Sequence, residues 1–445
     1  MNQIAIGDTS LFYVIEGSGV GYPYRNATAF FTFSAEPTVR ERIELQLSGT
    51  PAQIGSVLGD LETIRQRSIA YQKAEFARPQ MLRFQPVPSG SYYYAQISDL
   101  SFEAHPKSYI TRKRGSYNIT LHYTRPNYFD GDQVELALTS GSGTDVTGGI
   151  DMINHTDAIG TPTSTALIKA ATALTDLPAP LRLEIEHNYA GGTIEDVYLG
   201  IFHHPTITDP SLLFANASAF TGGTNTANAA AIGGYYRTRT WTSANWYAMH
   251  NLGMSVSTVN NLDGRTYRPI LHLYASHAYT DLYMRIKLIR GAQVLKTCEP
   301  VLCDPNYRYV IFPPIQIPPN QLLRETTLSH IEIEIYGKKI DGAAATILMD
   351  QLILLPMDYA ADYIGFFDMS QNDKLIDDAF RGLSIVRYSA AQQETVAHLR
   401  VGSPLLLYPD ENTHIVTVLA NTTHIIAKDQ TFKLRAYYRP RVSVL

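Results

Sequence analysis

Apolar and polar residues alternate along many short stretches of this chain, and this alternation constrains the fold more than any other feature. Between 39 and 48, Ile43, Leu45 and Leu47 alternate with polar residues. A period of two puts successive side chains on opposite faces of a strand. Further alternating or fully apolar stretches, separated by turn-rich segments, lie at 197–202, 268–275, 282–289, 331–336 and 346–355. The sequence therefore predicts a mostly β fold.

One segment departs from this pattern and predicts a helix over residues 51–77. Thr50 and Gln53 flank Pro51 as a capping box, in which the Thr50 hydroxyl accepts from a free backbone N–H and the Gln53 side chain reaches back to the cap residue. Apolar residues spaced by three or four then predict a buried face made of Ile54, Val57, Leu58, Leu61 and Ile64. With the strands around it, this helix predicts an N-terminal β-sandwich or barrel with one packed helix over residues 1–130.

Two prolines, Pro178 and Pro180, stand directly before an alternating run in the segment DLPAPLRLEIEH, residues 176–187. Proline fixes φ and lacks the N–H that a central strand donates. We therefore expect the prolines to mark a module boundary and to protect the first edge of a new sheet. The preceding residues 131–175 are rich in Gly, Ser, Thr and Ala and are predicted to be a linker or extended segment.

The strands after this boundary predict a jelly-roll β-sandwich over residues 176–356. Residues 357–445 predict a further β-rich region with one short helix near 372–380. That region either folds alone or completes the N-terminal domain, and the sequence leaves both alternatives open.

Charge and hydropathy exclude two classes of partner. The formal net charge is −5 and charged residues make up 17% of the chain, so no basic field is present to bind nucleic acid as a primary ligand. No stretch approaches eighteen uninterrupted apolar residues, and the N-terminus has no basic segment followed by an apolar one. We expect neither membrane insertion nor a secretion signal.

Sequence motifs give no support for catalysis or metal binding. The chain has no nucleophile elbow, Walker loop or HExxH motif, and its two cysteines fit no zinc or redox spacing. His203 and His204 are adjacent on a strand and face opposite ways, so they do not form a common metal site. The segment INHTDA (153–158) holds Asn154, His155 and Asp157, but a metal site needs three or four ligands that converge. The segment FDGD (129–132) lacks the spacing of a calcium loop and is expected to be a solvated turn. We expect no enzyme, no cofactor and no metal.

The aromatic residues leave one binding function open. Trp241, Trp246 and the tyrosine-rich strands could form a surface on which a glycan stacks. Such residues more often fill a sandwich core or a subunit interface.

Several segments, in this order along the chain, resemble structural proteins of bacteriophage tails, in particular distal-tail-like proteins of long non-contractile tails. They are LGDLETIRQRSIAYQKAE (58–75), ITLHYTRPNYFDG (119–131), TGGIDMINHTDA (147–158), DLPAPLRLEIEHN (176–188), MDQLILLPMDYA (349–360) and LRAYYRPRVSVL (434–445). The chain is longer than the smallest members of that family, so the resemblance assigns no role to the region after Met357.

The resemblance implies a virion protein that is assembled in the host cytoplasm. Its N-terminal domain would close into a ring, commonly a hexamer, that joins the tail tube protein to the tail tip hub, with DNA only passing through the lumen. The outer jelly-roll domain would resemble carbohydrate-binding modules. An alternative function is a glycan-binding accessory protein for attachment to the host surface. A sandwich-fold hydrolase is a third hypothesis, which the missing motifs disfavour.

Overall fold

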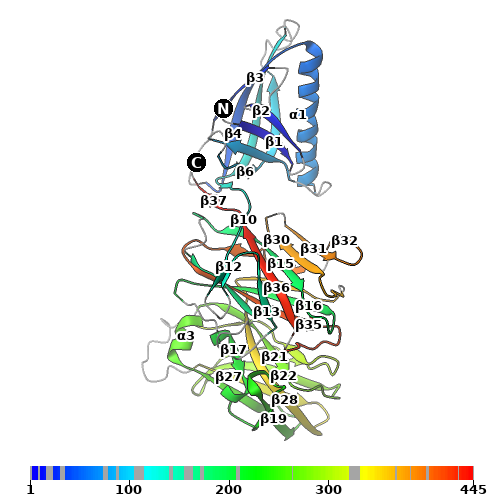
Figure 1. Ribbon diagram of the computed structural model, residues 1–445. Coiled ribbons are helices and arrows are strands. Elements are labelled where there is room, and N and C mark those ends of the chain that lie inside the picture. Colours follow the sequence, from blue (N-terminus) through cyan, green and yellow to red (C-terminus); the bar gives the residue numbers. More distant parts are fainter. Residues whose placement is uncertain are drawn as a thin grey trace. The chain divides into compact units, whose positions relative to one another are not determined.

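The computed structural model confirms a mostly β protein, with antiparallel sheets and one long helix (Figure 1). It describes residues 3–8, 11–16, 24–30, 36–73, 79–86, 90–104, 115–139, 144–154, 164–170, 175–206, 211–262, 264–319, 331–365, 368–380, 382–396, 400–428 and 430–443. The chain divides into two compact units. Unit 1 comprises Met1–Val134, Leu174–Ala179 and Arg439–Leu445, and unit 2 comprises Glu135–Ala173 and Pro180–Tyr438.

Unit 1 contains two antiparallel sheets and the long helix α1 (Pro51–Gln72). One sheet has the order β2 (Leu11–Glu16), β1 (Gln3–Asp8), β5 (Met81–Gln85), β6 (Tyr93–Gln96), β9 (Phe129–Asp130) and β37 (Arg441–Val442). The other has the order β3 (Tyr24–Phe30), β4 (Thr38–Ser48), β8 (Ser116–Pro126) and β7 (Ser98–Ala104). The C-terminal end of the chain thus completes a sheet that the N-terminal end begins.

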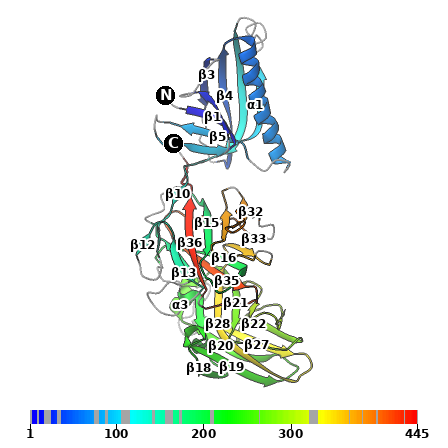
Figure 2. The ribbon, with the colours of Figure 1, turned by 45° about the vertical axis from the view of Figure 1, so that its right-hand side comes forward.

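Helix α1 runs alongside the strands of unit 1 (Figures 1 and 2). The Thr50 hydroxyl accepts from the Gln53 backbone N–H at 3.3 Å, and the Gln53 side chain accepts from the Thr50 N–H at 2.9 Å, which completes the capping box. Ile54, Leu61 and Ile64 are buried in the same core as residues of both sheets.

Two details of the helix differ from the expectation. Val57 is buried, whereas Leu58 is only partly buried and packs at the border of the core. The helix ends at Gln72 with Lys73 as its cap residue, before the predicted end at 77, and residues 74–78 lie outside the described part of the chain.

A buried ion pair holds β4 against β8. The Arg125 guanidinium donates to both carboxylate oxygens of Glu41, at 2.8 and 2.7 Å, and the Tyr123 hydroxyl donates to the same carboxylate at 3.1 Å. The side chains of Arg125 and Glu41 are 1% and 0% exposed. A third donation, from Arg125 to the Pro126 carbonyl at 2.7 Å, and the Phe129 ring under the guanidinium leave this cation well satisfied in the core.

Unit 2 contains two large sheets, here called the base sheets, whose strands come from both ends of the unit. The first has the order β10 (Val134–Glu135), β36 (Thr431–Tyr438), β15 (Ala179–His187), β30 (Lys374–Asp378), β31 (Leu383–Tyr388) and β32 (Gln393–Val396), with β13 (Ile150–Ile153) on β36 and β34 (Leu406–Leu407) on β15. The second has the order β12 (Asp145–Val146), β11 (Leu138–Thr139), β14 (Thr165–Ile168), β35 (Asn412–Asn421), β16 (Ile194–His204), β29 (Tyr359–Tyr363) and β33 (Arg400–Gly402).

A second pair of sheets is inserted into the hairpin formed by β16 and β29, which pair directly with each other. We call these sheets, with the residues between them, the inserted sandwich (residues 211–356). One sheet has the order β18 (Thr224–Ala227), β19 (Tyr235–Thr242), β28 (Ala344–Pro356), β21 (Thr266–Leu273) and β25 (Tyr309–Ile311), with β17 (Phe214–Asn216) and β26 (Ile315–Gln316) beside it. The other has the order β20 (Tyr247–Met254), β27 (Ile331–Lys339), β22 (Leu282–Arg290) and β23 (Gln293–Thr297), with β24 (Val301–Leu302) on β22. A single hydrophobic core fills the space between them and continues onto β16 and β35.

The structure therefore divides the chain differently from the predicted domains. The segment 131–175 is not a linker, because β11 and β14 pair within a base sheet and β13 pairs with β36. The sandwich begins after β16 rather than at 176, since β15 and β16 pair with strands from the last part of the chain. Of residues 357–445, only 439–445 join unit 1. The helix expected near 372–380 is replaced by strand β30.

Pro178 and Pro180, at the start of β15, do mark a boundary, because unit 1 gives way to unit 2 between Ala179 and Pro180. They do not protect an edge: β15 lies between β36 and β30 inside a base sheet. Pro180 is the second residue of β15, and the ladder with β36 begins one residue later, at Leu181 opposite Tyr438, so that ladder does not require the N–H that Pro180 lacks.

Candidate ligand face on the inserted sandwich

Strands β20, β27 and β22 present one face to the core and one outward. In β22, Leu282, Met284, Ile286 and Leu288 are buried, and in β27, Ile331, Ile333 and Ile335 are buried. The alternate positions point the opposite way because the side-chain period of a strand is two. They carry Tyr283, Arg285 and Lys287 on β22, and Glu332, Glu334, Tyr336 and Lys338 on β27, all only partly buried. This outward set is here called the β22–β27 face.

Three side chains of this face and Trp246, which directly precedes β20, form a stack that alternates aromatic ring and cation. The Arg285 guanidinium lies 4.1 Å from the Trp246 ring centre and 5.6 Å from the Tyr336 ring centre. The Lys287 ammonium lies 4.2 Å from the Tyr336 ring. Register explains the arrangement, because Arg285 is directly opposite Tyr336 across the sheet. Cation–π contacts at partly exposed sites are worth about 0.5–1 kcal/mol each.

The carboxylates of the face are held by neutral donors. The Tyr336 hydroxyl donates to Glu334 at 2.6 Å, and the Asn251 amide donates to Glu332. Burial, together with the hydrogen bond to Glu334 and the charge of that carboxylate, raises the pKa of Tyr336 to about 12. Tyr336 therefore stays protonated and keeps its ring fixed between the two cations.

The two tryptophans suggested for glycan contact have different environments. Trp246 is partly buried and supplies the first ring of the stack. Trp241 is 4% exposed and belongs to the hydrophobic core, so its ring is not offered to a ligand in solution. It fits there because residue 337 is glycine: a Cβ at Gly337 would come within 2.6 Å of the Trp241 ring.

A second, smaller stack lies on unit 1. The Arg83 guanidinium is 4.6 Å from the Phe12 ring and 4.7 Å from the Tyr92 ring. It also donates to the Gln3 side chain at 2.9 Å, and Asp132 accepts from the Tyr94 hydroxyl at 3.0 Å. These contacts are made within the unit and are those of a cross-strand packing cluster.

His203 and His204 make contacts within the fold and do not form a metal site. His203 is buried, shares a 3.0 Å hydrogen bond with the Thr413 hydroxyl and packs against the Tyr408 ring at 4.5 Å. Burial lowers the pKa of His203 to about 3, with smaller contributions from Arg265 and His414. His204 lies on the other side of the strand and accepts from the Thr206 N–H at 3.1 Å. Among the described residues no group of three or more His, Cys, Asp or Glu side chains is placed to hold a metal ion.

The acidic segments also have structural partners. Asn154 donates to the Leu419 and Ala427 carbonyls and accepts from the Leu419 N–H, while residues 155–158 of the same motif lie outside the described part of the chain. Asp130 is buried and accepts from the Arg441 guanidinium at 2.8 Å. The expectation of a solvated turn at FDGD is therefore wrong, since Asp130 anchors the returning C-terminal end of the chain.

Cys303 and His277 form the one thiol–imidazole contact seen among the described residues, at 3.0 Å. The His277 Nδ1 accepts from the Tyr279 N–H, so its Nε2 carries the proton of the neutral ring and points toward sulfur. Burial raises the pKa of Cys303 to about 12 and lowers that of His277. A thiol that stays protonated, beside a ring that donates to it, is not arranged as a nucleophile and its base.

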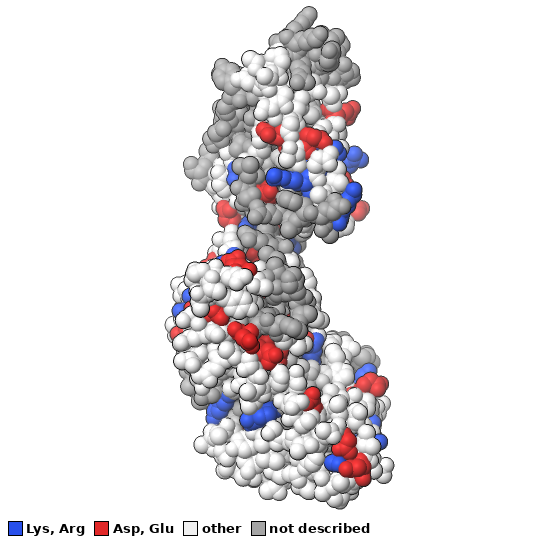
Figure 3. Space-filling view, turned by 90° about the vertical axis from the view of Figure 1, so that its right-hand side faces the viewer, with Lys and Arg blue, Asp and Glu red and all other residues white. Residues whose placement is uncertain are grey.

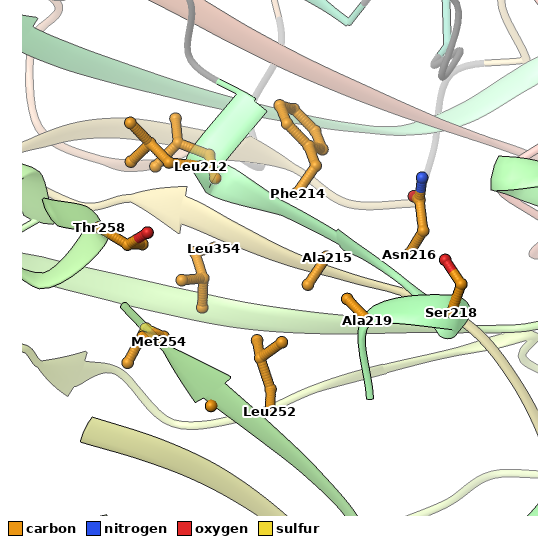
Figure 4. A pocket seen from close by; sticks show the side chains of 12 residues that line it. Leu212, Phe214, Ala215, Asn216, Ser218, Ala219, Leu252, Met254, Thr258 and Leu354 are labelled. Atoms are coloured by element: carbon orange, nitrogen blue, oxygen red, sulfur yellow. The ribbon is translucent and has the colours of Figure 1, made fainter. Parts of the chain in front are cut away.

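A cavity of about 310 Å³ opens between β17, the end of β20 and the helix α3 (Val256–Leu262). Leu212 and Phe214 lie on one side of it and Leu252 and Met254 on the other, with Leu354 between them (Figure 4). Its polar lining is limited to Asn216, Ser218 and Thr258 and backbone groups. The described lining contains no titratable side chain and offers apolar contact rather than chemistry.

On the face drawn in Figure 3, the charged side chains of the described residues are scattered among neutral ones and form no continuous basic patch. No helix among the described residues is long and apolar enough to span a membrane.

Comparison with known proteins gives no family assignment. No family model and no curated protein matches the chain. Among solved structures, the chain is similar to one from the phage p2 baseplate in its activated conformation with Sr, at 9% identity and a TM-score of 0.23, covering 44% of this chain and 72% of that one. It is also similar to the infectious bursal disease virus VP2 subviral particle, at 10% identity and a TM-score of 0.15, covering 71% and 81%. TM-scores this low carry no argument about fold or function.

Proposed function

We propose that this protein is a structural component of a bacteriophage tail, located in the virion, that forms a ring at the distal end of the tail tube and joins the tube to the tip. The observation that supports this proposal most is an agreement in architecture. The sequence resemblance implies an N-terminal β-sandwich with one packed helix and an additional β-sandwich domain. Unit 1 has two sheets and the packed helix α1, and unit 2 carries the inserted sandwich.

The proposed role is architectural and assigns no catalytic residue. Its partners are further copies of this chain, the tail tube protein and the tip proteins, with DNA as cargo in the lumen. A ring of identical subunits needs two different surfaces on each copy that fit one another and a rotation that closes. The described residues expose few large apolar side chains, which suits a subunit that waits unassembled before it meets its neighbours.

The proposal is tested by imaging the purified full chain in negative stain at several concentrations, together with native mass spectrometry. We expect closed rings in end-on views, with one mass that is a whole multiple of the chain mass. The decisive second arm adds a tail tube protein from the same virion, since a ring can require its tube as a template. Monomers in both arms would reject the ring.

A second candidate function is attachment to a host-surface glycan, and the β22–β27 face favours it. Trp246 and Tyr336 are aromatic rings held partly exposed beside two cations. Glycan arrays probed with the full chain test this function, with Trp246→Ala as the variant that should lose binding. Because Trp241 is buried, Trp241→Phe serves as the matched control that should keep it.

A further inference from the structure

We propose that the β22–β27 face binds a polysaccharide that bears carboxylate groups, of the uronic-acid type. The inference rests on the second candidate function, attachment to a glycan, and is independent of ring formation. It names both the chemical class of the ligand and the side chains that select it.

The cations of this face have no carboxylate partner among the described residues. No ion pair joins Arg285, Lys287 or Lys338 to an acidic side chain, and the contacts of the first two are with aromatic rings. The nearby carboxylates of Glu332 and Glu334 are already engaged by Asn251 and Tyr336. The face therefore carries three cations against two carboxylates, and none of these cations is in an ion pair with a described residue, although Lys287 is directly opposite Glu334 in the strand register.

A base sheet of the same unit provides the internal comparison. Three cations at its outward positions are paired: Arg182 lies 2.6 Å from Glu184, and Lys374 and Arg435 lie 3.1 and 2.8 Å from Glu186. The two pairs with Glu186 join neighbouring strands, and opposite charges placed in this way help to stabilise a sheet. The β22–β27 face departs from that pattern within the same unit.

The side chains of the stack are held in place before any ligand arrives. The Arg285 guanidinium is packed between two rings, and its buried Nε atom has no hydrogen-bond partner within the described structure. The Tyr336 ring is fixed by its hydroxyl, which donates to Glu334. Groups already ordered in the free protein lose little entropy on binding.

The alternation of rings and cations selects the class of ligand. Each residue of a uronic-acid polymer offers an apolar face of its pyranose ring and one carboxylate. The stack offers Trp246, Arg285, Tyr336 and Lys287 in the matching order of ring, cation, ring and cation. A guanidinium binds a carboxylate through two parallel hydrogen bonds. Arg285 and Lys287 are two positions apart on one strand, so their backbones are separated by roughly 6.6 Å.

Other ligands meet only part of this pattern. A neutral glycan would leave both cations unpaired, and a polyol phosphate polymer has no sugar ring to stack. Single-stranded nucleic acid could stack its bases on the rings, but it needs a long basic groove. The chain carries a net charge of −5.

The test is isothermal titration calorimetry of the full chain with oligogalacturonate, in parallel with dextran, poly(glycerol phosphate) and single-stranded DNA. We expect oligogalacturonate to bind, with an affinity that falls as salt is raised, because its charges are screened. Arg285→Met and Lys287→Met should each lower the affinity roughly tenfold, which corresponds to the loss of one charged contact. Arg182→Met, on the paired base sheet, should bind as the wild type does.

Melting curves of each variant, followed by tryptophan fluorescence, show whether the inserted sandwich is folded. If Arg285→Met does not fold, Lys287→Met decides, because Lys287 contacts the Tyr336 ring alone among the aromatic rings of the described residues. The proposal is overturned if oligogalacturonate does not bind, if dextran binds as tightly, if folded variants keep full affinity, or if the phosphate polymer or DNA binds more tightly. If the protein binds oligogalacturonate but forms no rings, the proposed ring is rejected and the proposed ligand of the β22–β27 face is kept.

Discussion

The strand pairs β4–β8 in unit 1 and β15–β36 in unit 2 are both long and antiparallel, but they bring together chain segments at very different separations. Ile43 is opposite Leu121 in the first pair, whereas Leu183 is opposite Ala436 in the second. Between β15 and β36 the chain also builds the whole inserted sandwich. Non-local pairs form late because the intervening loop has to be closed first. We therefore expect unit 1 to acquire most of its structure from its own first 134 residues before the base sheets of unit 2 are complete.

The buried polar clusters of the two units also differ in which parts of the structure they join. Glu41 and Arg125 join neighbouring strands of one sheet in unit 1. In unit 2, the Tyr309 hydroxyl donates to Asp196 at 2.7 Å and lies 3.1 Å from the Tyr198 hydroxyl. Tyr309 belongs to the inserted sandwich, whereas Asp196 and Tyr198 belong to a base sheet. The first cluster fixes the register of a single sheet, and the second fixes the inserted sandwich onto its host sheet.

The largest effect is expected from Arg125→Met in unit 1. The substitution leaves the Glu41 carboxylate buried without its cation, which costs about 3–5 kcal/mol of the free energy of unfolding. Both tryptophans lie in unit 2, and the long helix α1 lies in unit 1, so circular dichroism at the helix band and tryptophan fluorescence follow different units. We expect the melting temperature read from the helix signal to fall and the melting temperature read from fluorescence to stay unchanged. The double variant Glu41→Gln, Arg125→Met should recover part of the lost stability of unit 1.

Leu61→Ala should be the next largest change, at about 2–5 kcal/mol, because it opens a cavity under a fully buried helix residue. Thr63→Ala, at an exposed position of the same helix, is the control and should leave stability nearly unchanged. Denaturant unfolding followed at the helix band measures both. Equal stability of wild type and Leu61→Ala would show that α1 does not pack as described.

Arg125→Met and Leu61→Ala both change unit 1, whose helix was predicted correctly from the sequence. The helix was predictable because its sequence signals are local. The capping box at Thr50 and the apolar face from Ile54 to Ile64 are encoded within one segment, so a local reading finds the helix. The strand that pairs with Leu183 lies far along the chain, and the sequence alone could not show that the strand containing Pro180 would be an interior one. Local signals predicted that strands exist, whereas their assignment to sheets depends on packing between distant segments.

The candidate ligand face was predictable only in part, for a related reason. Residue type alone indicated both Trp246 and Trp241 as possible ligand contacts. Trp241 is buried in the core, where it has room because residue 337 is glycine. It missed Arg285, Lys287 and Tyr336. The alternation in residues 282–290 and 331–339 shows which side chains point outward. Only the register of β22 against β27 places Arg285 beside Tyr336.

Tyr309→Phe tests the corresponding polar cluster of unit 2, with a smaller expected effect. The variant removes a donor to the buried Asp196 carboxylate, which still accepts from the Gly365 N–H at 2.8 Å. A loss of about 1–3 kcal/mol is expected, because the remaining oxygen is left without its partner. Here tryptophan fluorescence should report the earlier transition, and the helix band should not. Tyr307→Phe, at the partly exposed neighbouring ring, is the control.

Thr50→Ala removes the helix cap and should cost unit 1 about 1 kcal/mol. The loss is smaller than that of Leu61→Ala because the freed N–H groups are at an exposed helix end and can bind water. Thr50→Ser keeps the hydroxyl and should restore the wild-type stability. An unchanged melting curve for Thr50→Ala, read at the helix band, would show that the capping box does not limit the stability of α1.

The smallest effect is expected from the paired cations of the base sheet and appears only on acidification. Burial pushes the pKa of Glu186 upward, but hydrogen bonds from Arg435 and Lys374 outweigh it and hold the pKa below its ordinary value of 4.5. Because the folded pKa is the lower one, this stabilisation is present above pH 4.5 and is lost as the pH falls through the folded value. Glu186→Gln should therefore lower the stability of unit 2 at neutral pH, by less than about 1 kcal/mol at this partly exposed site, and flatten its decline in acid. Glu394→Gln, in an exposed pair with Arg387, is the matched control. Urea titrations at neutral and acidic pH measure the free energy of unfolding of both proteins. If it falls equally for wild type and Glu186→Gln on acidification, the ion pairs of Glu186 do not stabilise the base sheet. The difference between this sheet and the β22–β27 face would then matter for ligand binding alone.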